Sequence, residues 1–319
     1  MSTDHPTTPA LQHLRLADGR RLAYAEYGAA HGPPVLYCHG FPSSHREARL
    51  LEPAAHALGV RLVTLDRPGY GGSDAQPGRT LLDWADDCAQ VLDRLGLERV
   101  ALIGVSGGGP FALACAARIP ARLSACTLVC PLGPVYRAEV LAAMPGPARA
   151  ALQLVRKAPR FARLVYGPPV SDLLARWPTL IERIRDAAAP RIDRTLLAEP
   201  EIRAIMNGNL RDALGAGAHG ALRDIQLYTQ PWGFDVADVD LAIDLWHGEI
   251  DGSVPVAHAH WYARHLRRCT SHILPGEGHF SLPLRHAEAI LTQLIERAAT
   301  PAGRKATTTM QIDAPGSRA

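Results

Sequence analysis

The sequence predicts an α/β fold in which a mostly parallel sheet carries helices on both of its faces. Short apolar runs, such as residues 35–38, 61–65 and 100–103, alternate with longer stretches of helical spacing. These runs are apolar without interruption, which is typical of strands that are buried on both faces. A chain of 319 residues is long enough for one such domain and an insertion within it.

The expected elements follow one another along the chain. Residues 14–27 alternate around Asp18-Gly19, a dipeptide favoured in tight turns, and this pattern predicts a hairpin. The next expected elements are strands at 35–38, 61–65, 100–103 and 123–129, with helices at 46–58, 81–95 and 110–118. The alternation resumes with strand 241–246, helix 256–267, strand 271–274 and helix 284–298.

The stretch between these two series, residues 132–232, has a different composition. It is rich in Ala, Arg and Leu, and eight prolines between residues 145 and 200 interrupt its helical patterns. We therefore expect an all-helical cap at 132–232, inserted between a first core part at 1–131 and a second at 233–300. Residues 301–319 contain few apolar side chains and are expected to form a disordered tail.

Composition excludes several function classes. The formal net charge is +3, and 32 of the 34 basic residues are arginines spread along the chain, so no nucleic-acid partner is expected. The six cysteines form no C-x-x-C pair and lie at no metal-ligand spacing from histidines, so no metal is expected. The first 14 residues lack the apolar core of a secretory signal, which predicts a cytoplasmic protein. Glycines and Pro110 interrupt the uncharged stretch 100–117, so neither a transmembrane segment nor a membrane partner is expected.

A candidate nucleophile lies in Gly104-Val105-Ser106-Gly107-Gly108, which fits the G-x-S-x-G pattern. It falls directly after a predicted strand and before a predicted helix, where a strained turn presents the serine hydroxyl above the sheet. A phosphate-binding loop is excluded because the Lys-Ser/Thr pair that it requires is absent. The sequence thus indicates Ser106 as a nucleophile.

A serine needs a base within hydrogen-bond distance and an acid that orients the base. Asp251 and His279 each follow a predicted strand, and the chain order Ser, Asp, His is the one expected for this arrangement. Glu249 is the alternative acid, although the Asp251-Gly252 turn favours Asp251. The rival bases are interpreted as structural histidines: His39, His247, His258, His260, His265, His272 and His286.

The oxyanion donors are expected from two backbone amides. His39-Gly40-Phe41-Pro42 follows the strand at 35–38, so the amides of Phe41 and Gly107 are the candidates for an oxyanion hole. Pro42 has no N–H to donate. The loop at residues 66–73 follows the next strand, and its proline and glycines fix its shape. We therefore expect this loop to support the site structurally and not to take part in catalysis.

These motifs resemble the serine α/β-hydrolase superfamily, and most closely its members with a helical cap. The loops are similar to those of epoxide hydrolases, but Ser106 stands where those enzymes carry an aspartate. The resemblance implies an eight-stranded, mostly parallel sheet, a catalytic triad of Ser106, Asp251 and His279, no cofactor, and a small-molecule acyl substrate held between core and cap.

The expected reaction is hydrolysis of a carboxylic ester, thioester or lactone through an acyl-enzyme. Hydrolysis of a C–C bond is an alternative, and a ligand receptor or signalling protein with slow or no turnover is another, because a fold alone does not establish turnover. Residues 134–231 hold 14 basic and 9 acidic side chains. This positive charge indicates either a preference for anionic substrates or only a solvated helical surface. Five aromatic residues either line the pocket or hold the cap in place: Phe161, Tyr166, Trp177, Tyr228 and Trp232.

Overall fold

The computed structural model describes residues 10–158, 160, 189–215 and 217–300. Its centre is a single eight-stranded sheet of order β1-β2-β4-β3-β5-β6-β7-β8, in which β2 runs antiparallel to its neighbours β1 and β4 and all other neighbours pair in parallel. The strands are β1 (Gln12–Arg15), β2 (Arg21–Gly28), β3 (Pro34–Cys38), β4 (Arg61–Leu65), β5 (Val100–Val105), β6 (Leu123–Val129), β7 (Ile243–Gly248) and β8 (Cys269–Leu274). The predicted α/β fold is confirmed.

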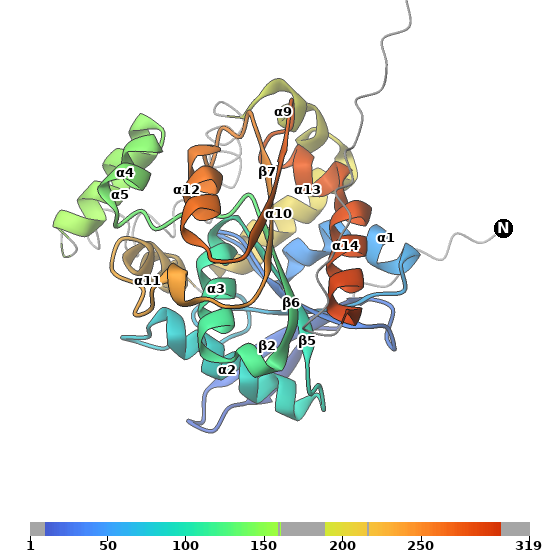
Figure 1. Ribbon diagram of the computed structural model, residues 1–319. Coiled ribbons are helices and arrows are strands. Elements are labelled where there is room, and N and C mark those ends of the chain that lie inside the picture. The colour runs from blue at the N-terminus through green and yellow to red at the C-terminus, as the bar shows by residue number, and fades with distance from the viewer. Residues whose placement is uncertain (1–9, 159, 161–188, 216, 301–319) are drawn as a thin grey trace, which may run out of the picture.

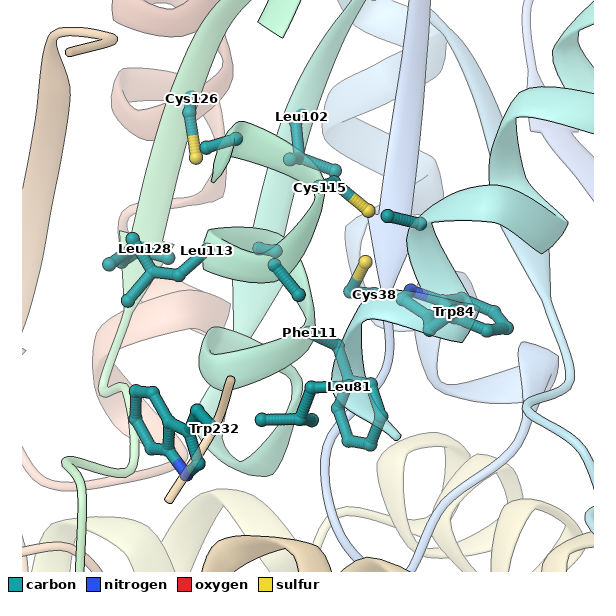
Figure 2. Packing of buried hydrophobic residues seen from close by; sticks show 14 of the residues in the cluster. Cys38, Leu81, Trp84, Leu102, Phe111, Leu113, Cys115, Cys126, Leu128 and Trp232 are labelled. Atoms are coloured by element: carbon teal, nitrogen blue, oxygen red, sulfur yellow. The ribbon is translucent and has the colours of Figure 1, made fainter. Parts of the chain in front are cut away.

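Helices cover both faces of this sheet, as Figure 1 shows. The helices α2 (Leu81–Arg94), α3 (Gly109–Arg118) and α12 (Ala257–His265) pack on one face, and α1 (Glu52–Ala57) and α14 (Ala287–Ala299) pack on the other. Successive side chains of a strand point to opposite faces, so Leu102 of β5 joins the first layer while Ile103 joins the second. Figure 2 shows Leu102 among the core side chains, including Phe111 and Leu113 of α3.

The structure departs from the predicted bounds where local packing decides them. Residues 46–58 form a 3₁₀ helix, η1 (His45–Leu51), that continues into α1 rather than one α-helix. Strand β7 extends to Gly248 because its parallel pairing with β8 continues to Leu274. Residues 281–299 form two helices, α13 (Ser281–Arg285) and α14, where one was predicted.

Between β6 and β7 the described residues form helices. We call residues 132–232 the inserted segment; its described helices are α4 (Ala138–Ala143), α5 (Gly146–Lys157), α9 (Arg191–Leu197), α10 (Pro200–Gly215) and α11 (His219–Tyr228). Helix α10 packs on η1, and α9 packs on α13. The division into core, cap and tail stays a prediction, and the predicted tail at residues 301–319 lies outside the described residues. Three of the predicted aromatic candidates also lie outside them: Phe161, Tyr166 and Trp177.

In the part of the chain that the structure describes, no helix is both long enough and apolar enough to cross a membrane.

Candidate active site

Ser106 lies on a tight turn between β5 and α3. Its φ is +53°, a left-handed conformation that non-glycine residues rarely adopt. The neighbouring glycines are sterically required: a Cβ on Gly104 would lie 2.6 Å from the Cβ of Ala112, and one on Gly108 would overlap the carbonyl oxygen of Cys38. The turn therefore holds the serine in one strained position at the carboxyl end of the sheet.

Three side chains from separate loops meet at this turn. The Nε2 atom of His279 lies 3.0 Å from the Oγ of Ser106, and its Nδ1 lies 2.7 Å from Oδ2 of Asp251. The other oxygen of Asp251 accepts hydrogen bonds of 2.8 Å from the amides of Ser253 and Val254. Hydroxyl, imidazole and carboxylate thus form one hydrogen-bonded chain whose last member is fixed by backbone.

Burial and charge act in opposite directions on this chain. Burial disfavours the charged form of both His279 and Asp251, but the two groups stabilise each other's charge. As a result the pKa of His279 is raised and the pKa of Asp251 is lowered from their usual values. The alternative acid, Glu249, is exposed to solvent, and no bond joins it to the imidazole.

The backbones of Phe41 and Gly107 lie side by side next to Ser106. A Cβ placed on Gly107 would lie 2.6 Å from the Cβ of Phe41 and 3.4 Å from its amide nitrogen. The Oε2 of Glu47 accepts a 2.6 Å hydrogen bond from the amide of Gly40 and so fixes the preceding residue of the loop. The structure therefore brings the backbones of the two predicted donor residues together next to Ser106.

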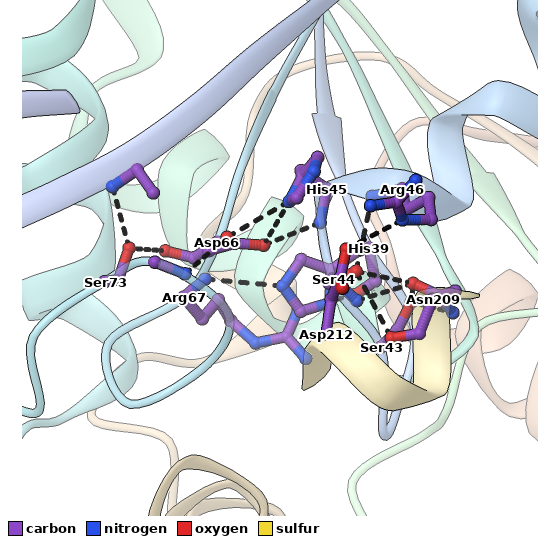
Figure 3. Close-up of polar contacts among 12 residues, drawn as sticks. His39, Ser43, Ser44, His45, Arg46, Asp66, Arg67, Ser73, Asn209 and Asp212 are labelled. Carbon is purple, nitrogen blue, oxygen red and sulfur yellow. Dashed lines mark hydrogen bonds and ion pairs between the residues drawn. The ribbon is translucent and has the colours of Figure 1, made fainter. Parts of the chain in front are cut away.

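The loop at residues 66–73 supports this arrangement, as Figure 3 shows. Asp66 accepts hydrogen bonds from the amide of His45, at 2.7 Å, and from the amide of Gly72, at 3.0 Å. The guanidinium of Arg67 donates to the carbonyl oxygens of His39 and Gly40. This loop therefore holds the backbone just before Phe41 in place.

Three of the rival histidines have structural partners. His39 is buried and accepts a hydrogen bond from the Arg67 amide, and burial lowers its pKa well below the usual range. The Nε2 of His247, within β7, lies 2.8 Å from the carbonyl oxygen of Val254. The Nδ1 of His258 accepts from the amide of Gly133 at 2.9 Å, and burial lowers its pKa to about 4.

Metal-binding side chains come together at one place among the described residues. One ligand atom each of Cys130, Asp251 and His279 lies within 4.8 Å of the others. Asp251 and His279 already bond each other, and burial raises the pKa of the Cys130 thiol well above its usual value. Asp251 and His279 are therefore engaged in the chain with Ser106, and the neutral thiol of Cys130 is a poor metal ligand.

Four polar residues of the inserted segment contact these loops, and of these only Tyr228 was a candidate from the sequence. Asn209 accepts from the amide of Ser44, Asp224 bonds Arg67, Tyr228 donates to the carbonyl oxygen of Gly107, and Asp193 accepts from the amide of His279. No motif surrounds them, and their spacing carries no periodic signal. Only the fold brings them to these loops.

Comparisons with known proteins agree with the fold. An uncharacterised hydrolase, YcgS of Bacillus subtilis, is 26% identical over 289 residues, 82% of this chain and 89% of that protein. The solved esterase EaEST of Exiguobacterium antarcticum superposes with a TM-score of 0.66 at 19% identity, covering 91% of this chain and 99% of that one. A thermophilic esterase of Thermogutta terrifontis gives 0.66 at 23% identity, covering 91% and 100%. Residues 33–285 match the family described as alpha/beta hydrolase fold, and the chain therefore belongs to the α/β-hydrolase-fold family.

Proposed function

We propose that the protein is a serine hydrolase that cleaves carboxylic esters through an acyl-enzyme on Ser106. The observation that carries this proposal is the hydrogen-bonded chain from Ser106 through His279 to Asp251. A serine hydroxyl is a weak nucleophile, and an imidazole at 3.0 Å that is oriented by a carboxylate is the group that activates it.

The steps follow from the positions of these atoms. The Oγ of Ser106 attacks the ester carbonyl carbon while Nε2 of His279 takes its proton, and the resulting imidazolium is stabilised by Asp251. The negative oxygen of the tetrahedral intermediate accepts hydrogen bonds from the amides of Phe41 and Gly107. His279 then gives the proton to the leaving alcohol, and water repeats the sequence on the acyl-enzyme to release the acid and free Ser106.

The type of nucleophile limits the candidate reactions to those that pass through an acyl-enzyme. Attack by Ser106 on a carbonyl produces an acyl-enzyme, which ester, thioester and lactone hydrolysis share. The esterases among the structural relatives support the ester, and the fold they share with this chain supports a small-molecule acyl substrate held between the sheet and the inserted segment as cap. Side chains and backbone amides of the protein supply every group that these steps need, so we propose no cofactor. We also propose a cytoplasmic location.

Covalent labelling of the purified protein tests the proposal. A fluorophosphonate presents a tetrahedral phosphorus to the attacking oxygen, so it should form one adduct per chain, which peptide mass mapping places on Ser106. A panel of short-chain esters, thioesters and lactones should then show steady-state turnover. The control is Ser106→Ala, which should neither label nor turn over.

Three outcomes would contradict the proposal. An adduct outside residues 103–111 would move the nucleophile. Turnover by Ser106→Ala at a tenth of the wild-type rate would do the same. A single slow turnover on every acyl compound would instead favour the receptor alternative.

A further inference from the structure

Asp193 of helix α9 reaches from the inserted segment to the loop that carries His279. Its side chain is completely buried. Oδ2 accepts a hydrogen bond of 2.8 Å from the amide of His279, and Oδ1 accepts one of 2.8 Å from the amide of Ser281. One carboxylate thus binds two backbone donors of the same turn, with one oxygen for each.

The residue before His279 is adapted to this contact. A Cβ on Gly278 would lie 2.5 Å from both oxygens of Asp193, so a larger residue there would push the carboxylate away. The amide of Gly278 is also used, because it donates to the hydroxyl of Ser281 at 2.7 Å. The turn from Gly278 to Ser281 is therefore closed around the carboxylate.

We propose that Asp193 is a positioning residue, which holds the backbone at His279 so that the imidazole spans Ser106 and Asp251. The inference rests on the proposed serine-hydrolase function. Asp193 touches no reacting atom. Asp251 orients the ring through Nδ1, whereas Asp193 fixes the backbone from which the ring projects. Two carboxylates from different parts of the chain thus together orient one imidazole.

The charge of Asp193 gives this role a readout that a purely structural contact would lack. The groups that face His279 are Asp251 and His247 of the β7 region, Cys130 after β6, Glu47 of η1 and Asp193 of α9. Burial lowers the pKa of His279, and the charges of Asp251, Asp193 and Glu47 raise it. Neutralising Asp193 should therefore lower the pKa of His279 and move the acidic limb of kcat/KM to lower pH.

The test compares Asp193→Asn, Asp193→Glu and wild type. In Asp193→Asn, one amide N–H would face an NH₂ group and the charge would be lost. We expect kcat to fall about tenfold to a hundredfold with KM little changed, and the acidic limb to shift downward. Asp193→Glu keeps the charge but displaces the carboxylate by one methylene. We expect a similar loss in kcat with the limb at its wild-type position.

The matched control is Asp212→Asn. Asp212 also joins the inserted segment to the core, through a 2.7 Å ion pair with Arg46, but it bonds no residue of the His279 turn. Its kcat and acidic limb should equal those of wild type. Circular dichroism and urea unfolding establish that each variant is folded.

Wild-type kcat in Asp193→Glu, or an unshifted limb in folded Asp193→Asn, would overturn the inference. If Asp193→Asn does not fold, the kcat of Asp193→Glu decides. The pKa of His279 is also measured by NMR of ¹³Cε1-labelled histidine, which needs no turnover. An inactive wild type would count against the proposed function. The difference in the pKa of His279 between wild type and Asp193→Asn, measured by NMR, would still decide the role of Asp193.

Discussion

Arg67 and Asp224 form an ion pair in which both side chains are fully buried. The Nε of Arg67 donates to Oδ2 of Asp224 at 2.9 Å, and Arg79 and Tyr70 bond the same carboxylate. Because Arg67 also donates to the carbonyl oxygens of His39 and Gly40, the pair connects helix α11 to the loop of the proposed oxyanion donors. One carboxylate of the inserted segment thus bonds two guanidinium groups next to the site.

Replacing Asp224 by Asn should destabilise the protein strongly. The amide would leave Arg67 and Arg79 buried with less compensation, and removing one partner of a buried pair costs about 3–5 kcal/mol. Urea unfolding measures the loss. The control is Asp86→Asn, which removes an exposed ion pair with Arg118 and should change the free energy of unfolding by about 0.5 kcal/mol or less. Equal effects of the two variants would contradict this account.

Ser106→Ala and His279→Ala should each lower turnover by about 10⁴-fold or more. The double variant should be scarcely worse than either single variant, because the groups act as a unit and their effects do not add. Steady-state kinetics of all three variants on one ester checks this. Additive losses would show that His279 and Ser106 act independently. Loss of wild-type activity on treatment with a chelator would point to metal chemistry.

Asp251→Asn should fold normally and lose most of its turnover. The amide no longer stabilises the imidazolium and can hold the ring in the wrong tautomer. Glu249→Gln is the matched control two residues away, and because Glu249 is exposed it should have nearly wild-type kinetics. The opposite ranking of the two variants would move the acid to Glu249.

The kcat/KM of the wild type should rise with pH and then level off. His279 accepts the proton of Ser106 only when it is neutral, so activity is lost as pH falls through its pKa. Because the surrounding carboxylates outweigh burial and raise that pKa, we expect the midpoint above the usual value of 6.5. Initial rates at low substrate concentration across pH 5–9 locate it. A midpoint below 6.5 would show that burial dominates.

His258 should make the folded protein sensitive to acid. Its pKa is lowered from 6.5 to about 4 by burial, so below pH 6.5 the unfolded chain binds a proton that the folded chain does not. The folded state then loses about 2 kcal/mol between pH 7.5 and 5. His258→Asn keeps an acceptor for the Gly133 amide without titrating, so urea unfolding at these two pH values should show a smaller loss. An equal loss would assign the acid sensitivity elsewhere.

The parts of the fold that depend on local patterns could be predicted from the sequence. The apolar runs, the Asp18-Gly19 turn and the Gly104-Val105-Ser106-Gly107-Gly108 motif each encode their own geometry, and Gly19 indeed has a φ of +87°. The loops of Asp251 and His279 were located because parallel strands end at one edge of a sheet. The bounds of η1, β7 and α13 were wrong where pairing or a 3₁₀ turn, rather than hydrophobic periodicity, decides them.

The contacts of the inserted segment could not be predicted in this way. Asp193, Asn209 and Asp224 are each separated by more than 80 residues from the partners that they bond. A charged residue in an Arg-rich helical stretch is usually solvated, so composition argued for exposure. These three side chains are instead buried, because each satisfies backbone or guanidinium groups of a loop at the proposed active site.

Residues 130–242 connect the parallel neighbours β6 and β7, so this stretch is the part that a chimaera of two relatives would exchange. Closing a connection of that length costs little more entropy than closing a shorter one, so chain entropy sets little limit on replacing the whole stretch. The side-chain contacts set a stricter limit. A transplanted stretch lacking counterparts of Asp193, Asn209 and Asp224 would leave amides and guanidinium groups of the recipient unsatisfied, so chimaeras that change substrate preference have to carry these three anchors with them.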